Sequence, residues 1–487
     1  MFNEADEMIC LRDVSGSLNP SLEVYRSVGG FEAFRKCLSM SSAAMVAEVE
    51  ASGLRGRGGA GFPTGTKWKF AAAELSQEKY MVANADEGEP GTFKDRYIMQ
   101  YAPFRFLEGL MIGALAIGAQ EAWIYIRHEY TVSMEVLRIA IEQLYHEGLA
   151  GADVDGEGRR LDVRLVSGAG SYLCGDETTM LESMEGKRGN PRYKPPFPAQ
   201  KGFRGKPTVV NNVETLAHLP DIMLKGAAWY RTIGTPNSPG TKLYCLSGKV
   251  ARPGVYELPM GTTLRSLVFD HAGGMLNNLP LKGALLGGAA GTFVDASMLD
   301  VPMDFDHLKE KGATLGSGAV IVMTEQESVP AMVENILAFF KHESCGKCVP
   351  CRMGTQHLLR LLTGITEGKG SEDDLETIRK IGDTLKKASL CGLGQTAPNP
   401  ALTTLDAFMD EYLAHIRDHK CPAGVCKALI SFSIDPKACT GCMACAKVCP
   451  VEAVSGTKKQ PHAIDPQTCI RCGACRGACK FGAVRVE

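Results

Sequence analysis

Apolar positions in the first half of the chain follow two different periods. Residues 122–129 and 161–168 are short runs rich in β-branched and aromatic side chains, which is the pattern of strands. Residues 131–149 instead repeat apolar side chains every three or four positions, as an amphipathic helix does. This alternation of strand and helix patterns predicts a layered α/β unit over residues 1–235.

Three further regions follow, each with its own pattern. Residues 236–243 read as a linker, and the next segment, to about residue 268, reads as short strands, a turn and a helix. Helical periodicity then dominates, and the end of the chain contains an internal repeat with a period of about thirty residues. The predicted domains are 1–235, 236–325 (small and β-rich), 326–420 (helical) and 421–487 (a linker and the repeat unit).

One long irregular segment interrupts the first domain. Residues 186–207 are rich in proline and glycine and carry seven basic residues and no acidic one. A charged loop is usually a solvated face, but a long ordered loop of this kind often works at a binding site.

Composition and charge argue against two classes of function. The net charge of −2 provides no global basic field for nucleic acid. The apolar run 107–119 contains Glu108 and is too short to span a bilayer, and residues 1–10 are acidic and lack the pattern of a signal peptide. The sequence predicts a cytoplasmic protein that is not membrane-embedded and does not bind nucleic acid.

Eighteen cysteines in 487 residues favour metal binding over disulfides, because the chain is large and shows no export signal. Two runs near the C-terminus share the spacing C-x2-C-x2-C-x3-C, which is typical of two-cluster ferredoxins. In such units the fourth cysteine of each run binds the other cluster. The predicted 4Fe–4S ligand sets are Cys439, Cys442, Cys445 and Cys479 for one cluster, and Cys469, Cys472, Cys475 and Cys449 for the other.

A third set repeats the short spacing at Cys345, Cys348 and Cys351, and the next cysteine is the distant Cys391. Spacing alone favours a 4Fe–4S cluster, with tetrahedral zinc as the alternative.

Cys421 and Cys426 lie just after His415 and His419 in a segment that resembles a structural zinc site. The alternative is two unpaired thiols in a linker. We expect zinc to be bound by the two cysteines and one of the histidines, with His415 as the assigned ligand.

Residues 53–68, GLRGRGGAGFPTGTKW, contain the phosphate-binding pattern G-x-G-x-x-G at Gly56, Gly58 and Gly61. By itself the match is weak, and a tight structural turn is the alternative. The stretch gains weight from four other motifs: NADEGEPGTFKDR (84–96), GAGSYLCGDE (168–177), NNVETLAH (211–218) and ESCGKCVPCRMG (343–354).

In this combination the chain closely resembles the NADH-oxidising flavoprotein subunit of respiratory complex I, over roughly residues 25–420. It also resembles the diaphorase-type subunits of soluble NAD(P)-linked hydrogenases and formate dehydrogenases, which share the appended ferredoxin unit. The resemblance implies a multidomain fold: a Rossmann-like FMN and NAD(P) domain, a ubiquitin-like β-grasp domain, a four-helix bundle with a 4Fe–4S cluster held by the third cysteine set, and an α+β two-cluster ferredoxin domain.

The resemblance also implies FMN and NAD(P)H as cofactors and assigns residues to them. Phe62, Phe70 and Phe197 match aromatic positions that stack on the dinucleotide, and Glu89 is expected to touch the nicotinamide as the catalytic residue. The remaining assigned residues are Gly56, Arg57, Gly58, Gly59, Lys67, Asn84, Asp86, Tyr172, Asp176, Glu177, Lys194, Asn211, Asn212 and Thr215. Asp176 stands where the family usually has glutamate, which leaves the choice between NADH and NADPH open.

The implied reaction is hydride exchange between NAD(P)H and FMN, followed by transfer of single electrons through three 4Fe–4S clusters. The expected partners are a small thioredoxin-like 2Fe–2S subunit and a further catalytic subunit, such as a hydrogenase or formate dehydrogenase, or ferredoxin. Electron bifurcation stays open. The alternative function is a non-catalytic, polyferredoxin-like scaffold with a degenerate flavin site.

Overall fold

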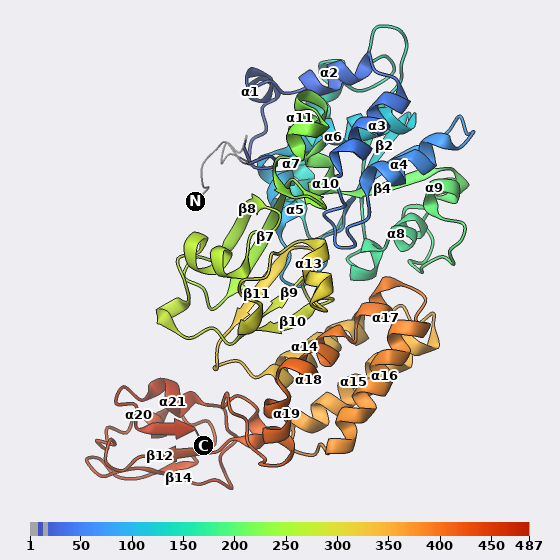
Figure 1. Cartoon of the computed structure of the whole chain (residues 1–487). Helices are drawn as coiled ribbons and strands as arrows, with labels where there is room; N and C mark the ends of the chain where they lie inside the picture. Colours follow the sequence, from blue (N-terminus) through green and yellow to red (C-terminus); the bar gives the residue numbers. More distant parts are fainter. Residues whose placement is uncertain (1–7, 13–17, 487) are drawn as a thin grey trace.

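The computed structural model describes residues 8–12 and 18–486 of the chain. Successive parts of the sequence form successive parts of the molecule (Figure 1). The N-terminal half forms a layered α/β region, followed by a mixed sheet, a group of long helices and a cysteine-rich C-terminal unit.

The N-terminal region is built on a four-stranded parallel sheet with the order β3-β2-β1-β4. Its strands are β1 Tyr80–Ala85, β2 Glu121–Ile126, β3 Asp162–Ser167 and β4 Thr208–Asn212. The predicted strands at 122–129 and 161–168, and the helix predicted at 131–149, are confirmed as β2, β3 and α7. The α/β prediction for this region is therefore correct.

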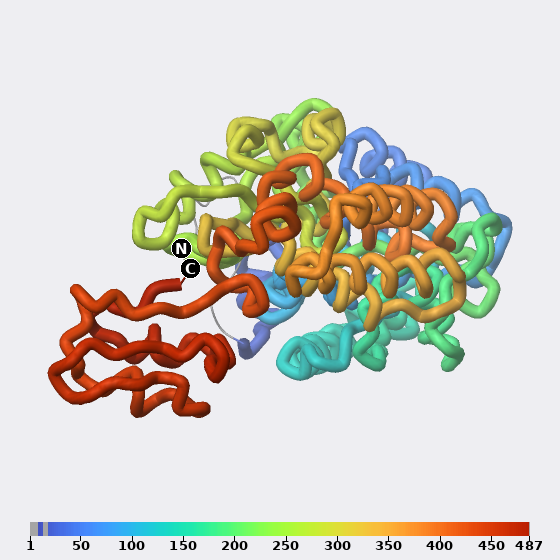
Figure 2. The backbone as a smooth tube through the Cα atoms, turned by 90° about the horizontal axis from the view of Figure 1, so that it is seen from below, coloured from blue at the N-terminus to red at the C-terminus, as the bar shows by residue number. Residues whose placement is uncertain are grey.

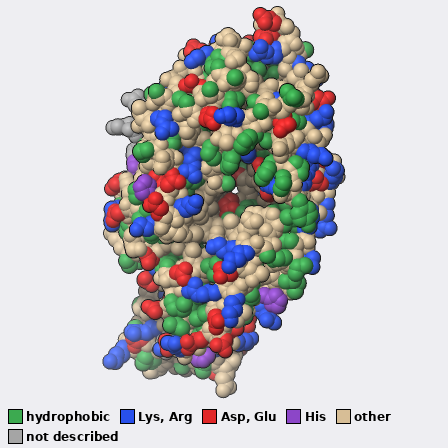
Figure 3. All heavy atoms as spheres, turned by 45° about the vertical axis from the view of Figure 1, so that its right-hand side comes forward, with side chains coloured by type: hydrophobic (Ala, Val, Ile, Leu, Met, Phe, Trp, Pro, Cys, Tyr) green, Lys and Arg blue, Asp and Glu red, His purple; other side chains and the backbone are tan. Residues whose placement is uncertain are grey.

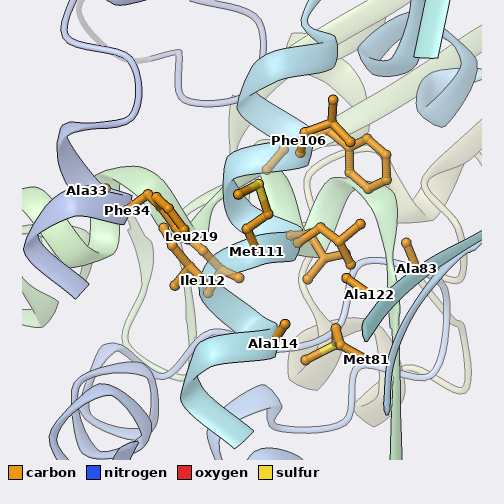
Figure 4. Packing of buried hydrophobic residues seen from close by; sticks show 14 of the residues in the cluster. Ala33, Phe34, Met81, Ala83, Phe106, Met111, Ile112, Ala114, Ala122 and Leu219 are labelled. Atoms are coloured by element: carbon orange, nitrogen blue, oxygen red, sulfur yellow. The ribbon is translucent and has the colours of Figure 1, made fainter. Parts of the chain in front are cut away.

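Helices surround this sheet, and α6 is the most deeply buried, since all 15 of its residues are buried, including the charged Arg105 and Glu108. Figure 4 shows Met111 and Ile112 of α6 between Phe34 of α2 and the strand residues Met81 and Ala83. The helices of the region are α1 Leu22–Ser27, α2 Glu32–Leu38, α3 Ser42–Ser52, α4 Thr64–Ala73, α5 Lys94–Tyr101, α6 Pro103–Ile117, α7 Thr131–His146, α8 Glu177–Met184, α9 Pro198–Lys201, α10 Val213–Ala217, α11 Leu219–Lys225 and α12 Ala227–Tyr230. Within the described ranges, none of the helices combines the length and apolar character needed to cross a membrane.

The second sheet has five strands in the order β10-β9-β11-β7-β8, and β11 with β7 is its one parallel pair. Its strands are β7 Thr241–Gly248, β8 Gly254–Pro259, β9 Gly283–Leu286, β10 Thr292–Asp295 and β11 Ala319–Met323, and α13 Phe305–Glu310 lies beside it. The predicted linker at 236–243 is wrong in part, since β6 Ser238–Pro239 pairs with β5 Gly234–Thr235 and β7 begins at Thr241.

Long helices follow, as the periodicity of residues 326–420 predicts. They are α14 Val329–Glu343, α15 Val349–Thr366, α16 Glu372–Ala388, α17 Gly392–Thr396, α18 Asn399–Ala407 and α19 Met409–Ile416.

The C-terminal unit forms a separate lobe at one side of the molecule (Figure 2). Its short elements repeat: β12 Phe432–Ile434, α20 Ala444–Lys447 and β13 Val454–Ser455, then β14 Ala463–Ile464, α21 Ala474–Ala478 and β15 Val484–Val486. Strand β12 pairs with β15, and β13 pairs with β14. Each of these two-stranded sheets therefore contains one strand from each half of the repeat.

Buried polar contacts join the first sheet region to the second. The N–H groups of Ile9, Cys10 and Leu11 each donate to the carboxylate of Glu257 on β8 at 2.8 Å. Cys10 also lies against the carbonyl of Glu214 in α10. Residues 8–12, which we call the N-terminal strap, therefore contact both regions and connect them.

Candidate flavin, nicotinamide and iron–sulfur sites

The glycine-rich stretch forms a tight loop between α3 and α4, so a helix precedes it rather than the strand that a dinucleotide fingerprint requires. Gly56 N–H donates to Phe62 O at 2.9 Å and closes the loop. A Cβ on Gly58 would lie 3.0 Å from the Cβ of Asn212, and one on Gly61, where φ is +62°, would lie 2.7 Å from the ring of Phe305. The loop is thus wedged between the end of β4 and α13, and only glycine allows that approach.

Arg57, assigned to the flavin, directs its side chain away from the outer face of the loop. The guanidinium is fully buried and donates to Thr241 O at 3.0 Å, Pro239 O at 2.7 Å and Tyr230 Oη at 3.1 Å. The backbone N–H of Arg57 donates to Thr215 Oγ1 at 2.8 Å. Both residues therefore hold the loop in place, and the guanidinium of Arg57 is not available to a ligand.

The polar residues of the assigned site gather where parallel strands end. Asn84 lies at the end of β1, and Asn211 and Asn212 at the end of neighbouring β4. Asn84 Nδ2 donates to Gly175 O at 2.8 Å, and Asn211 Oδ1 accepts from Trp68 Nε1 at 2.8 Å. The carboxyl ends of parallel strands are the usual ligand-binding edge of an α/β sheet.

Two of the assigned residues after β1, Asp86 and Glu89, are half-buried and have carboxyl groups with raised pKa values. Burial raises the pKa of Asp86 to about 7, and its Oδ2 has no hydrogen-bond partner among the described residues. Burial likewise raises the pKa of Glu89 to about 7, against the lowering effect of its hydrogen bonds. Glu89 accepts from Tyr172 Oη at 2.5 Å and from Ala290 N at 2.7 Å. The structure thus brings Glu89 and Tyr172 together next to the second sheet region.

The two neighbouring acids of the GDE motif have different surroundings. Asp176 Oδ2 accepts from the N–H groups of Thr178 and Thr179 at 3.0 Å each and caps α8. Glu177 instead lies between two lysines, 2.9 Å from Lys67 Nζ and 3.0 Å from Lys194 Nζ. Burial alone would raise the pKa of Glu177, but the lysines lower it to about 2.

The three assigned phenylalanines have uncovered rings. Phe62, Phe70 and Phe197 are 49%, 56% and 53% exposed, so each ring has a face free for contact. Figure 3 shows a hollow near the middle of one face of the molecule, with acidic atoms at its floor.

Sequence reasoning missed a buried ionic network behind this site. Lys94 Nζ lies 2.6 Å from Asp95 Oδ1 and 2.9 Å from Glu214 Oε2, and Glu214 also pairs with Lys242 of β7. Asn212 joins the network because its Nδ2 donates to Asp95 Oδ2 at 2.6 Å and its Oδ1 accepts from Lys94 at 3.2 Å. The charged pair in the FKDR end of the 84–96 motif was the available signal.

The same motif contains a second missed residue, Glu87. Its carboxylate accepts from the N–H groups of Asp95 and Arg96 at 2.8 and 3.0 Å and from Tyr130 Oη at 2.9 Å. Glu87 thereby fixes the start of α5, which carries Lys94.

The third cysteine set lines one cavity at the ends of the long helices. Cys345, Cys348, Cys351 and Cys391 face it together with Leu173 and Pro191 of the first region. Leu173 directly follows Tyr172, so this cavity adjoins the Glu89 pair. Ser344 Oγ lies 3.2 Å from Cys351 Sγ.

In the C-terminal unit, a second cavity is lined by Cys439, Cys442, Cys445 and Cys479. The fourth cysteine of one run thus lies with the first three of the other, as the crossed ligand assignment expects. Cys469, Cys472, Cys475 and Cys449 form the complementary set in sequence.

A separate buried group lies where the long helices meet the C-terminal unit. Potential ligand atoms of His415, Cys421 and Cys426 all lie within 4.8 Å of one another. His415 Nδ1 contacts Glu411 O at 2.7 Å, which leaves Nε2 for the cysteines, 3.3 Å from Cys426 Sγ. His419, the other histidine considered, is not part of this group.

Comparison with known protein families gives matches along most of the chain. Residues 49–221 match the Nuo51 FMN-binding domain, and residues 331–415 match the iron–sulfur binding region of NADH-ubiquinone oxidoreductase-F. Residues 431–480 match a 4Fe-4S dicluster domain, and residues 243–286 match the SLBB domain.

Individual relatives agree with these matches. The chain is 47% identical to the NADP-reducing hydrogenase subunit HndC of Solidesulfovibrio fructosivorans, over 92% of this chain and 91% of the relative. It is 45% identical to the F 2 subunit of NADH-quinone oxidoreductase from Rhizobium meliloti (strain 1021), over 85% of this chain and 99% of the relative. The crystal structure of NAD+-reducing [NiFe]-hydrogenase in the H2-reduced state superposes with a TM-score of 0.74 at 37% identity, covering 82% of this chain and 67% of that one.

Identity at this level over most of both chains shows common descent, and the predicted resemblance is confirmed. The chain belongs to the family of FMN- and iron–sulfur-containing, NADH-oxidising oxidoreductase subunits that includes the F subunit of NADH-quinone oxidoreductase and HndC of NADP-reducing hydrogenase.

Proposed function

We propose that this chain exchanges hydride between NAD(P)H and FMN and relays single electrons through three 4Fe–4S clusters to partner proteins. The observation that carries the proposal is the junction at Tyr172 and Leu173. Tyr172 donates to Glu89 in the assigned nicotinamide site, and Leu173 lines the cavity of the third cysteine set. Bound FMN would take up the two electrons of a hydride and release them one at a time to clusters.

The residues present fit FMN. The backbone of Gly56, Gly58 and Gly59 offers a surface without side chains, and Lys67 of the following helix α4 supplies a cation, which is paired with Glu177 in the structure. The buried Oδ2 of Asp86 is a polar atom without a partner among the described residues, as expected of a group that meets a ligand. Asn84, Asn211 and Thr215 complete the assigned flavin site.

The uncovered rings of Phe62, Phe70 and Phe197 are suited to stacking on the flat parts of a dinucleotide. Glu177 and Lys194 would face its ribose and phosphates. Glu89 is proposed to position the nicotinamide, and Tyr172 and Ala290 fix its carboxylate for that task.

Cofactor content tests the proposal and separates it from the scaffold alternative. We expect one FMN and about twelve iron atoms per anaerobically purified chain, from three clusters of four. A chain with all the iron but no flavin would support the scaffold. A chain near eight iron atoms would contradict the three-cluster assignment.

The four domain ranges also stay proposals. A single parallel pair within a five-stranded sheet supports the ubiquitin-like β-grasp domain, and α14, α15, α16 and α18 are candidates for the four-helix bundle.

We further propose that the chain works in a cytoplasmic complex with a small 2Fe–2S subunit and a second catalytic subunit or ferredoxin. Two relatives are named as subunits of larger enzymes, which supports this. The isolated chain should oxidise NAD(P)H with an artificial acceptor and should lose coupling to its physiological acceptor. Full coupling by the single chain would contradict the need for partners.

His415, Cys421 and Cys426 are proposed to bind zinc at the hinge before the ferredoxin unit. Hydrogen bonding with Cys426 lowers the pKa of Cys421, which favours the thiolate form that zinc binds. Glu411 O orients the imidazole, as outer groups do for zinc-bound histidine. Metal analysis should find one zinc per chain, and Cys426→Ala should remove it; a zinc-free wild-type chain would contradict the proposal.

A further inference from the structure

Among the positions that differ between the two halves of the ferredoxin unit, one lies at a cysteine-lined cavity in the second half. Residues 432–439, FSIDPKAC, and residues 462–469, HAIDPQTC, align without a gap at an offset of thirty. The same offset relates all four cysteines of each run. Phe432 in the first half therefore corresponds to His462 in the second.

His462 lies against the cysteine set of the opposite repeat. It is only 4% exposed, and it is one of the residues that line the cavity formed by Cys439, Cys442, Cys445 and Cys479. The backbone nitrogen of His462 lies 3.5 Å from Cys439 Sγ, so the backbone of His462 is in contact with a proposed cluster ligand.

The surroundings hold the imidazole ring in one place. Nε2 lies 3.0 Å from the sulfur of Met443. On another side a Cβ on Gly456 would lie 2.7 Å from Cγ of His462, so glycine is needed where the ring packs. A ring confined in this way cannot turn out to solvent.

The remaining ring nitrogen has no protein partner within the described part of the chain. Nδ1 of His462 is buried and makes no hydrogen bond there. A buried polar nitrogen without a partner is costly, which points to an acceptor that the polypeptide does not provide. A thioether is a weak acceptor, so Met443 does not compete strongly for the single N–H of a neutral imidazole.

We propose that His462 donates a hydrogen bond from Nδ1 to a sulfur of the cluster bound by Cys439, Cys442, Cys445 and Cys479, and that this makes it the higher-potential cluster of the ferredoxin pair. The proposal rests on the pair of clusters proposed above. Hydrogen bonds to cluster sulfurs stabilise the added negative charge of the reduced state and raise the reduction potential.

The other half of the repeat lacks this donor. Phe432 occupies the matched position, and its ring lies 3.7 Å from where a Cβ on Gly473 would be. Gly473 corresponds to Met443 at the same offset, so the pair His462 and Met443 is replaced by Phe432 and Gly473. Backbone N–H groups lie near cysteines of both sets, at Ala453 and Arg471 for the second and at His462 for the first. An aromatic hydrocarbon ring offers no N–H, so the second cluster lacks the side-chain donor proposed for the first.

Reciprocal substitutions in the full-length chain test the proposal. Redox titration followed by electron paramagnetic resonance should resolve the clusters, with the cluster of the helical region as an internal reference. His462→Phe should lower the potential of one ferredoxin cluster and bring the pair together. Phe432→His should raise the potential of the other cluster.

We expect His462→Phe to change the partition of an electron between the two clusters by at least tenfold, which is about 59 mV for one electron. His462→Gln keeps a side-chain N–H donor and should restore part of the difference. Unchanged potentials in His462→Phe with full iron content would overturn the proposal, as would an equal shift of both clusters. If His462→Phe lost iron, His462→Gln and Phe432→His would decide between the same two outcomes.

Iron content separates this proposal from the proposed function. Wild-type protein with about twelve iron atoms and two ferredoxin clusters of equal potential would contradict only the role of His462. Wild-type protein without paramagnetic resonance signals from the two ferredoxin clusters would contradict the proposed function itself.

Discussion

The parallel-sheet region and the ferredoxin unit differ in what fills their interiors. In the first, a continuous apolar cluster runs from the N-terminal strap through α6 and β1. In the second, the buried apolar cluster consists of Cys445, Cys475 and Val484. Two of these three side chains are proposed iron ligands. The sheet region can therefore hold its shape by burying apolar surface, whereas the ferredoxin unit depends on its metal centres.

Removal of iron should have the largest effect, because it should unfold one of the two regions and leave the other folded. A Cys445→Ser, Cys475→Ser double variant, or protein stripped of iron by a chelator, should lose the fold of residues 431–486 while the sheet region stays folded. Hydrogen exchange measured by mass spectrometry would show unprotected amides in that unit and protected amides in α6 and β1.

Protein stripped of FMN but not of iron is the matched control, and its ferredoxin amides should stay protected. Protection of residues 431–486 in iron-free protein would show that the small apolar cluster is sufficient, contrary to the comparison.

The buried ionic network offers the next largest effect. Lys94 is 1% exposed, and Asp95 and Glu214 raise its pKa against the lowering effect of burial. Lys94→Met leaves two buried carboxylates short of a cation, which should lower the free energy of unfolding of the sheet region by about 3–5 kcal/mol. Trp68, Trp123 and Trp229 are the only tryptophans and all lie in this region, so fluorescence during urea unfolding reports on it alone.

Lys69→Met is the control, because Lys69 is 62% exposed and its pair with Glu50 lies at the surface. Loss of such a pair should change the free energy of unfolding by about 0–1 kcal/mol. Equal effects of the two variants would mean that Lys94 does not stabilise this region through its buried pairs.

Sequence patterns predicted those parts of the molecule in which local signals and tertiary structure agree. The strands at 122–129 and 161–168 and the helix at 131–149 have clear periods, and cysteine spacing is a local property. The segment 236–243 was misread because its glycine and prolines suggested a linker, whereas edge pairing at Ser238 depends on a partner strand.

The sequence did not allow us to predict the direction in which individual side chains point. Arg57 matches a flavin-binding motif, yet its guanidinium serves the contact with the second sheet region. Likewise, Lys94 and Glu87 are charged residues in a recognisable motif, but the burial of Lys94 depends on α10 and β7, which lie far along the chain. Spacing defines which residues are neighbours in one element and leaves open what the other elements bring to them.

A pH experiment tests the sheet region further, because the region contains a buried carboxylate whose pKa is raised. Burial raises the pKa of Glu87 from 4.5 to about 7 in the folded state. The folded state therefore holds its proton more tightly than the unfolded one, and stability present below about pH 4.5 is lost as pH rises through about 7. The difference corresponds to about 3 kcal/mol for a complete shift.

Glu87→Gln cannot ionise, so its unfolding free energy should fall less than that of wild type between pH 5 and pH 8, by about 2–3 kcal/mol. Tryptophan fluorescence during urea unfolding at each pH measures this. Parallel profiles for the two proteins would contradict the assignment of the pH dependence to Glu87.

The smallest expected effect is a change in the preference between NADPH and NADH. Because the sheet region is stabilised by its own apolar core, a substitution at its edge should leave the fold intact. Glu177 is half-buried in the assigned dinucleotide site, where its single carboxylate pairs with both Lys67 and Lys194. Glu177→Ala removes a carboxylate that would repel a 2′-phosphate and frees two ammonium groups to attract one. We expect kcat/KM for NADPH relative to NADH to rise by about 5- to 150-fold, equivalent to about 1–3 kcal/mol.

Glu182→Ala on the same helix, where the carboxylate pairs with Arg192, should leave the ratio unchanged. Because Glu177 has a pKa of about 2, the carboxylate is ionised at every pH at which the enzyme would be assayed, so the ratio should not vary with pH through this group. An unchanged ratio in Glu177→Ala would remove Glu177 from ribose recognition and leave the choice of dinucleotide to Asp176 and the basic loop.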